Sequence, residues 1–509
     1  MKLLFAAIAV VLAAAAFGTW WSYPDQQSEV PVIYWVTDRN PARDMQVELF
    51  HQWLVKNGYT VPGAEGKPEP AVRLRLDTAN REVSKQVIQG VSGVAGDLLD
   101  IGSGTGMRYF QSIGLLRDVT DWGRQLKFDP SYTYAAIEPE ITLDGRQYMF
   151  PCNVAVTMYW IHKGTFEKYG VPVPPKRWTF DQFEAIGKQL VEAANPPGQR
   201  RTVFFADGVV LELMYRSLGL GKFNETGTRC TLDDPRFVAV LERVYKWTYV
   251  DHLLPTAADR QGFDTQQGYG GPTLQLFNSG NFAMFYSGRY ALIQLRKFKD
   301  PQGGPLALSV SEPPHGGFPS TTIATRAAGM YIGSPNPELA RLFQAFLASE
   351  DYNMQIVRDA DALPPIPQYA QTELFNRPPD HPNEWGCHEM FFNAAQDIAI
   401  GGDYSPFVLD TIANREVNRV HELFMNDMRS AKEAAAEVAQ RVNAEIARSL
   451  QEQPKLRARY DQLVQQQKLI DQYKAQGKAI PLELVTSTFY RAYYRRTNQA
   501  APETDENAP

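Results

Sequence analysis

The chain has 509 residues, of which 44% are hydrophobic and 21% charged, so it is long enough to bury more than one hydrophobic core. Its net charge of −6 argues against a nucleic-acid partner, because a protein that binds nucleic acid presents a basic face. The three cysteines, Cys152, Cys230 and Cys387, allow at most one disulfide and lack the spacing of a metal site. We therefore expect each of them to be a small buried side chain.

Residues 1–24 contain an apolar run, residues 3–18, that follows Lys2 and precedes Trp20 and Trp21. A basic residue before such a run predicts a secretory signal peptide. The run also suits an uncleaved membrane anchor, because about 17–25 apolar residues span a bilayer and tryptophans favour its interface. Both alternatives place the protein outside the cytoplasm, in the periplasm or another extracytoplasmic space, and the second tethers it to the membrane.

Strands and helices alternate after this segment. Residues 31–37 are rich in β-branched and aromatic side chains and predict a strand, whereas Met45, Leu49 and Trp53 recur every four residues, as on one face of a helix. Residues 71–77 predict a second strand, and a helix and a third strand follow. This order predicts an α/β fold, an open sheet covered by helices, with ligands bound at the carboxyl ends of the strands.

The glycine-rich turn at residues 100–106, DIGSGTG, follows the third strand and precedes a helix. It resembles the first motif of S-adenosylmethionine-dependent methyltransferases, where such a turn lets a small ligand approach the backbone. Any tight junction between a strand and a helix needs the same glycines, so the motif requires confirming context. A methyltransferase therefore stands as the alternative function.

The next segments resemble a different family, the extracellular solute-binding proteins of ABC importers (family 1, maltose-binding and glycerol-phosphate-binding type). GLLRDVTDW at residues 114–122 resembles a motif that follows the first sugar-binding turn in that family. Residues 145–171, which include YWIHK, resemble the family's crossing from the first lobe to the second. LFNSGNFAMFYSG at residues 276–288 is the most specific match, and residues 336–349 continue the series in the family's order.

This resemblance implies a two-lobed periplasmic-binding-protein fold of type II, with a hinge between two sheets flanked by helices. Lobe one is expected at residues 30–145 plus about 290–330, and lobe two at residues 150–285 plus about 335–450. Residues 451–509 lie beyond the family pattern and predict a helical extension with a polar tail. A scaffold protein that uses this extension is a further alternative.

The family's function is to bind a carbohydrate-like solute by lobe closure and to deliver it to the membrane subunits of an ABC permease. The resemblance thus implies no catalytic residue, no metal and no cofactor. Ala155 stands near the place where maltose-specific members carry an acidic sugar contact, so the identity of the sugar does not transfer.

Candidate ligand-binding residues are polar or aromatic side chains at predicted strand ends and lobe crossings, because polyols need hydrogen-bonding groups and flat aromatic rings. They are Trp35, Asp38, Arg39, Ser103, Thr105, Asn153, Phe205, Asp207, Arg289, Tyr290, Arg326 and Asn414.

Several candidates have a structural alternative. Trp35 and Phe205 suit a hydrophobic core, and Arg289 suits an ion pair at the hinge, as does Arg326. Asp38 and Ser103 equally suit the caps of the helices that follow them. Arg39, Arg289 and Arg326 together would favour an anionic ligand such as a sugar phosphate or glycerol phosphate, since arginine binds phosphate through two parallel hydrogen bonds.

Overall fold

A computed structural model describes residues 30–63, 66–262 and 271–502. Its first lobe contains three parallel strands, β1 (Val32–Val36), β4 (Arg73–Asp77) and β5 (Leu98–Ile101). Helices α2 (Ala42–Lys56), α3 (Val83–Val91) and α4 (Gly104–Ser112) follow these strands in turn. The alternation of strands and helices predicted from the sequence is therefore confirmed.

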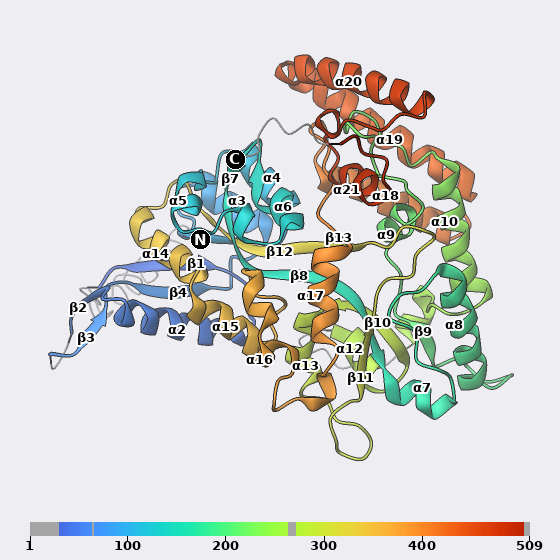
Figure 1. Ribbon diagram of the computed structural model, residues 1–509, viewed down its shortest axis with the longest axis horizontal. Coiled ribbons are helices and arrows are strands. Elements are labelled where there is room, and N and C mark those ends of the chain that lie inside the picture. The colour runs from blue at the N-terminus through green and yellow to red at the C-terminus, as the bar shows by residue number, and fades with distance from the viewer. Residues whose placement is uncertain (1–29, 64–65, 263–270, 503–509) are drawn as a thin grey trace, which may run out of the picture.

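Two long strands join the lobes (Figure 1). Strand β8 (Met149–His162) pairs through its first half with β12 (Thr321–Met330), which also pairs with β5. The second half of β8 lies between β10 (Phe282–Gly288) and β11 (Leu308–Ser311). The hydrogen-bonded order is β4-β1-β5-β12-β8-β10-β9, in which β9 is Phe204–Ala206. The two sheets are thus continuous at the hinge, where β8 passes from one lobe into the other.

The first lobe has an aromatic core between its sheet and its helices. The ring of Trp35 on β1 lies 4.8 Å from that of Phe343, which belongs to α14 (Pro337–Leu347). The same cluster includes Phe50 of α2 and Ile356 of α15 (Glu350–Asp359). Helices α14 and α15, for which the sequence predicted a place in lobe two, therefore pack against the first lobe.

The second lobe buries a larger cluster around β9 and β10. Its helices include α8 (Phe180–Ala194), α10 (Pro235–Tyr245), α18 (Asp410–Met425) and α19 (Ala431–Glu452). Thr179 caps α8 by accepting a hydrogen bond from the backbone N–H of Gln182, as its position before the helix predicts.

The C-terminal extension is helical in the structure. It contains α20 (Arg457–Ala475) and α21 (Thr488–Arg496), which pack on the second lobe (Figure 1). The remaining helices are α5 (Thr120–Gln125), α6 (Glu138–Ile141), α7 (Lys163–Tyr169), α9 (Leu211–Arg216), α11 (Ala257–Gln261), α12 (Gly271–Asn278), α13 (Leu292–Leu295), α16 (Glu373–Asn376) and α17 (His388–Asp397). The remaining strands are β2 (Thr60–Pro62), β3 (Pro68–Pro70), β6 (Thr142–Leu143), β7 (Arg146–Gln147) and β13 (Ala399–Ile400).

The predicted signal peptide or membrane anchor, residues 1–24, lies outside the described residues. Within the described ranges, no helix is long and apolar enough to cross a bilayer. Cys152, Cys230 and Cys387 are free and buried, as expected for small core side chains.

Candidate ligand-binding cleft

A pocket of about 420 Å³ opens at the carboxyl ends of β1 and β5, the edge at which the sequence predicted a ligand. It lies between the beginnings of α3 and α4 and reaches β12 at the hinge. Its walls are formed by Thr37, Asp38, Arg81, Glu82, Val83, Gln86, Asp100, Ile101, Gly102, Ser103, Gly106, Phe110 and Arg326. Three of the predicted site residues, Asp38, Ser103 and Arg326, are among them.

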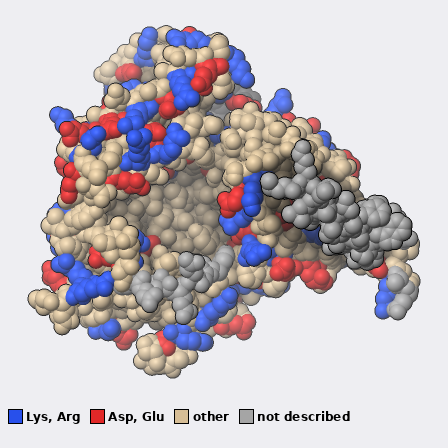
Figure 2. Space-filling view, turned by 180° about the vertical axis from the view of Figure 1, so that it is seen from behind, with Lys and Arg blue, Asp and Glu red and all other residues tan. Residues whose placement is uncertain are grey.

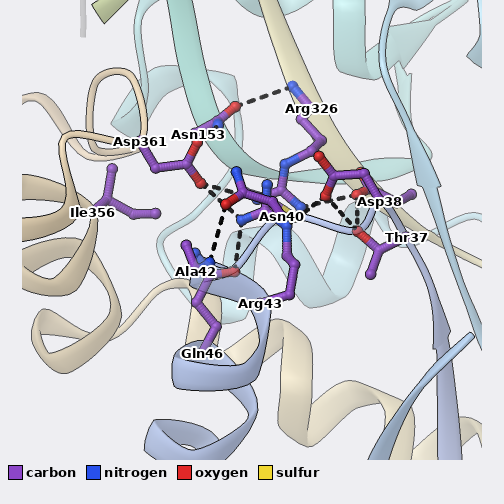
Figure 3. A network of polar contacts seen from close by, with 12 residues as sticks. Thr37, Asp38, Asn40, Ala42, Arg43, Gln46, Asn153, Arg326, Ile356 and Asp361 are labelled. Carbon is purple, nitrogen blue, oxygen red and sulfur yellow. Dashed lines mark hydrogen bonds and ion pairs between the residues drawn. The ribbon is translucent and has the colours of Figure 1, made fainter. Parts of the chain in front are cut away.

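A buried network of charges supports this pocket (Figure 3). Arg43 of α2 donates from Nε to Asp38 and from Nη1 to Asp361, both at 2.8 Å. The amide of Asn153 donates to the second oxygen of Asp361 at 3.1 Å. Burial opposes the charge of Asp361, but Arg43 and Arg326 outweigh it and hold the pKa of this carboxyl below its usual value. Asn153 and Asp38 are thus joined through Asp361 and Arg43.

Arg326 extends this network to the wall of the pocket. Its Nη1 donates to Asp100 Oδ2 at 2.9 Å, and its guanidinium lies over the buried ring of Trp35, 5.4 Å from the ring centroid. Asp100 Oδ1 and the Nε and Nη2 atoms of Arg326 are buried and make no hydrogen bond with the described residues. Arg326 Nη2 instead lies 3.7 Å from Asp361 Oδ2, within the range of an ion pair.

The strand pair at the hinge presents small and hydroxyl-bearing side chains on one face. Ala155 of β8 lies opposite Ala324 of β12, and alternate residues of both strands are only half-buried there. Thr157 contacts the hydroxyl groups of Tyr286 and Thr322, each at 2.5 Å. Sequence reasoning missed these three hydroxyl residues; the alternation of side chains in residues 322–326 was the available signal.

Tyr286 continues the half-buried strip into the second lobe. It borders a small pocket whose other residues, among them Val209, Val210 and Pro313, are mostly apolar. The backbone N–H of Tyr286 donates to Asp207 Oδ1 at 3.1 Å, and burial raises the pKa of Asp207 to about 6. Figure 2 shows a hollow near the middle of the face opposite Figure 1, with charged side chains on its rim and mostly uncharged ones within it.

The structure does not bring all the predicted site residues to this cleft. Phe205 is fully buried, and its ring packs 4.9 Å from that of Phe183, so it belongs to the core of the second lobe. Arg289 is buried and donates to the carbonyls of Val357 and Ala362, at 3.0 and 2.8 Å; burial lowers its pKa to about 9. Phe205 lies within β9 and Arg289 directly follows β10, and both side chains are buried away from the cleft.

Four other predicted residues lie elsewhere. Thr105 donates to Asp410 at 3.2 Å, and Asn414 donates to the same carboxylate at 2.8 Å, so these two meet at a contact between α4 and α18. Arg39 donates to Thr78 at 3.2 Å on the exposed surface. Tyr290 is 36% exposed and folds back against Gly288.

The structure also shows whether Ser103 and Asp38 cap the helices that follow them. The Ser103 hydroxyl accepts a hydrogen bond from the backbone N–H of Gly106 at 3.3 Å, so it caps α4 while lining the pocket. Asp38 makes no cap hydrogen bond to α2 but pairs with Arg43 in the first turn of that helix.

The sequence matches the family model described as bacterial extracellular solute-binding protein. The match covers residues 69–354, which is more than half of the chain. No curated protein matches.

Solved structures share the fold at low sequence identity. The ABC substrate-binding protein Lmo0181 from Listeria monocytogenes, in complex with cycloalternan, is 22% identical with a TM-score of 0.65 and covers 82% of this chain and 99% of its own. A solute-binding protein from Thermotoga lettingae, bound with α-D-tagatose, is 14% identical with a TM-score of 0.64, covering 82% and 100%. The maltose/maltodextrin-binding domain MalE from Bdellovibrio bacteriovorus, bound to maltotriose, is 13% identical with a TM-score of 0.61, also covering 82% and 100%.

These matches do not support the methyltransferase interpretation of the glycine-rich turn. The turn instead forms part of the pocket wall, through Gly102, Ser103 and Gly106. With this fold and a family match over residues 69–354, the chain belongs to the bacterial extracellular solute-binding proteins.

Proposed function

We propose that the protein is the extracytoplasmic substrate-binding component of an ABC importer and that it binds an uncharged, carbohydrate-like solute. The observation that carries this proposal is the pocket at the strand ends, whose wall combines the carboxylates of Asp38 and Asp100 with the guanidinium of Arg326. A hydroxyl group both donates and accepts, so the hydroxyls of a sugar suit a wall that offers both carboxylate acceptors and guanidinium donors. The pocket volume of about 420 Å³ lies in the range of small-molecule sites.

The charges around the pocket favour a neutral ligand over a phosphate. Of the three arginines that suggested an anionic ligand, Arg39 contacts Thr78 and Arg289 is occupied by backbone carbonyls. Arg326 already lies 2.9 Å from Asp100 and 3.7 Å from Asp361. A phosphate placed in the pocket would meet the carboxylates of Asp38, Glu82 and Asp100 as well as the guanidinium groups of Arg81 and Arg326, so the net charge of the wall repels it.

The hydroxyl strip of Thr157, Tyr286 and Thr322 supports the same ligand class. It lies between the pocket of the first lobe and the apolar pocket of the second, so a solute that bridges the lobes would contact it. Three of the structures with the same fold are complexes with cycloalternan, tagatose and maltotriose, which are carbohydrates. We infer that the lobes close on the solute, that no covalent bond is made or broken, and that a permease receives it unchanged.

Residues 1–24 would bring the protein to this location. A basic residue followed by an apolar run suits export, either as a cleaved signal or as a membrane tether. Mass determination of the protein purified from whole cells distinguishes the two, since cleavage removes this segment.

The test is a thermal-shift screen of the protein without residues 1–24, followed by calorimetry. Maltose, maltotriose and tagatose are compared with glucose 6-phosphate and glycerol 3-phosphate. A sugar present at 100 times its Kd would stabilise the fold by about 2.7 kcal/mol. Binding of a phosphate ester without binding of any neutral sugar would overturn the proposed ligand class.

A matched pair of variants locates the site. Ala155→Leu places a larger side chain on the half-buried face of β8, opposite the small Ala324, so binding should be lost while the fold persists. Ala193→Leu makes the same change on the exposed surface of α8 and should leave binding unchanged. Equal affinities of the two variants would exclude the hinge face as the site.

A further inference from the structure

The C-terminal extension contacts two of the segments that connect the two lobes. Besides β8, two segments cross between the lobes: the run from β11 to β12, which contains Phe318 and Pro319, and the run from α17 to α18, which contains Ile398. These two crossings are paired to each other where β13 joins β12, at Thr321 and Thr322. The extension packs on this junction.

Arg496, the last residue of α21, holds both crossings at once. Its Nη1 donates to the carbonyl of Ile398 at 3.4 Å, and its Nη2 donates to the carbonyl of Pro319. Its guanidinium also lies over the ring of Phe318, 4.1 Å from the centroid. One planar guanidinium with several donors therefore links two segments of the chain that lead from one lobe to the other.

Apolar contacts reinforce this link. The ring of Tyr493 lies 5.0 Å from that of Phe318, and Phe489 packs on both. Ile400 of β13 belongs to the same buried cluster. A shift of one crossing against the other would separate these packed groups, and packed interfaces resist such continuous deformation.

The extension is itself fixed to the second lobe through Glu225. This buried carboxylate accepts from Gln467 at 2.7 Å and Tyr494 at 2.5 Å and pairs with Lys474. The Glu225 carbonyl accepts from the backbone N–H groups of Thr486 and Ser487, both at 2.9 Å.

On its other side the extension reaches the first lobe. Arg459 of α20 lies 3.2 Å from Asp144, which is in the turn between β6 and β7. This exposed ion pair is weak by itself. It shows that the extension, anchored on the second lobe, extends past the hinge to the first.

We propose that the C-terminal extension is a hinge brace that holds the lobe separation of the ligand-free protein. The brace consists of Phe489, Tyr493 and Arg496 on α21 and acts on Phe318, Pro319 and Ile398. The brace stabilises the ligand-free arrangement of the lobes. Part of the binding free energy of the solute is therefore used to move the lobes out of this arrangement, since a ligand shifts such an equilibrium only by its differential affinity for the two states.

The test measures lobe separation in the ligand-free protein, so its result does not depend on which solute is bound. Spin labels are attached at Gln52→Cys on α2 and Ala193→Cys on α8, both exposed positions, and the distance distribution is recorded by pulsed electron paramagnetic resonance. In Arg496→Ala we expect a second or broader distance population, with the population ratio changed about tenfold for the loss of two hydrogen bonds. A distribution identical to that of the parent protein would overturn the proposal.

Two controls keep the test decisive. Arg491→Ala removes an exposed arginine from the same helix and should leave the distribution unchanged. Tyr493→Phe keeps the ring that packs on Phe318 and should also leave it unchanged, whereas Tyr493→Ala should broaden it. If all these variants broaden the distribution equally, the effect is general loosening of the extension and the specific brace is wrong.

Discussion

Arg326 and Asp100 come from adjacent antiparallel strands, β12 and β5, and are joined by a hydrogen bond of 2.9 Å. Their side chains are 14% and 5% exposed, so this is a nearly buried ion pair in the wall of the pocket. The pair therefore contributes to the fold and to the ligand site together, and the two contributions can be measured separately.

Arg326→Met leaves the Asp100 carboxylate buried with its charge uncompensated. We expect the free energy of unfolding to fall by about 3–5 kcal/mol, because removing one partner of a buried pair costs more than removing both. Urea denaturation of the single variant, Asp100→Asn and the double variant measures the coupling. Arg341→Met, which breaks an exposed pair with Glu338, is the control and should cost less than about 1 kcal/mol. A double variant as unstable as the sum of the singles would contradict this prediction.

Tyr286→Phe removes the hydroxyl that Thr157 and Thr322 share on the hinge strip. Isothermal titration with the sugar found in the screen should show affinity reduced by about 5- to 10-fold, the value of one hydrogen bond. Tyr34→Phe changes an exposed tyrosine of β1 outside the cleft and should leave affinity unchanged. Unaltered affinity in both variants would mean that the solute does not reach the strip.

Asp207 should make stability depend on pH. Burial raises its pKa in the folded protein to about 6, from 3.8 in the unfolded chain, so between these values the folded state holds a proton that the unfolded state has lost. The resulting stabilisation is complete below about pH 4 and is lost as pH rises through about 6; two pKa units correspond to at most about 3 kcal/mol.

Asp207→Asn keeps an oxygen acceptor for the Tyr286 N–H and removes the charge. Compared with the parent protein, the variant should be more stable at pH 7.5 and gain little at pH 4.5. Urea denaturation of both proteins at the two pH values gives the difference in unfolding free energy between variant and parent. The other carboxylates are the same in both proteins, so their contributions cancel in this difference. The same gain at both pH values would show that the Asp207 carboxyl does not titrate in this range.

Glu225→Ala should release the C-terminal extension. The substitution leaves the Gln467, Lys474 and Tyr494 side chains without their shared acceptor, and trypsin should then cut faster at Lys474 and Lys478. Mass spectrometry of a timed digest identifies the cut. Glu483→Ala, an exposed glutamate of the extension, should digest at the parent rate. Equal digestion of all three proteins would mean that Glu225 is not the anchor.

The family and the fold could be predicted from local patterns. Strand and helix periodicity, together with spaced motifs such as GLLRDVTDW, depends on neighbouring residues in the chain and is visible without coordinates. The same reasoning placed Asp38 and Ser103 at strand ends and Arg326 in a returning strand pair, and all three line the pocket.

The rest was decided by tertiary packing. Arg289 and Phe205 carry side chains that suit a sugar site, but the core turns one toward carbonyls of α15 and its following loop and the other into an aromatic cluster. Thr157 and Tyr286 are 129 residues apart and meet only because β8 and β10 pair across the hinge. Sequence alone determines which groups a strand can present; which face receives them, and which distant groups they meet, depends on the register and packing of segments that are far apart in the chain.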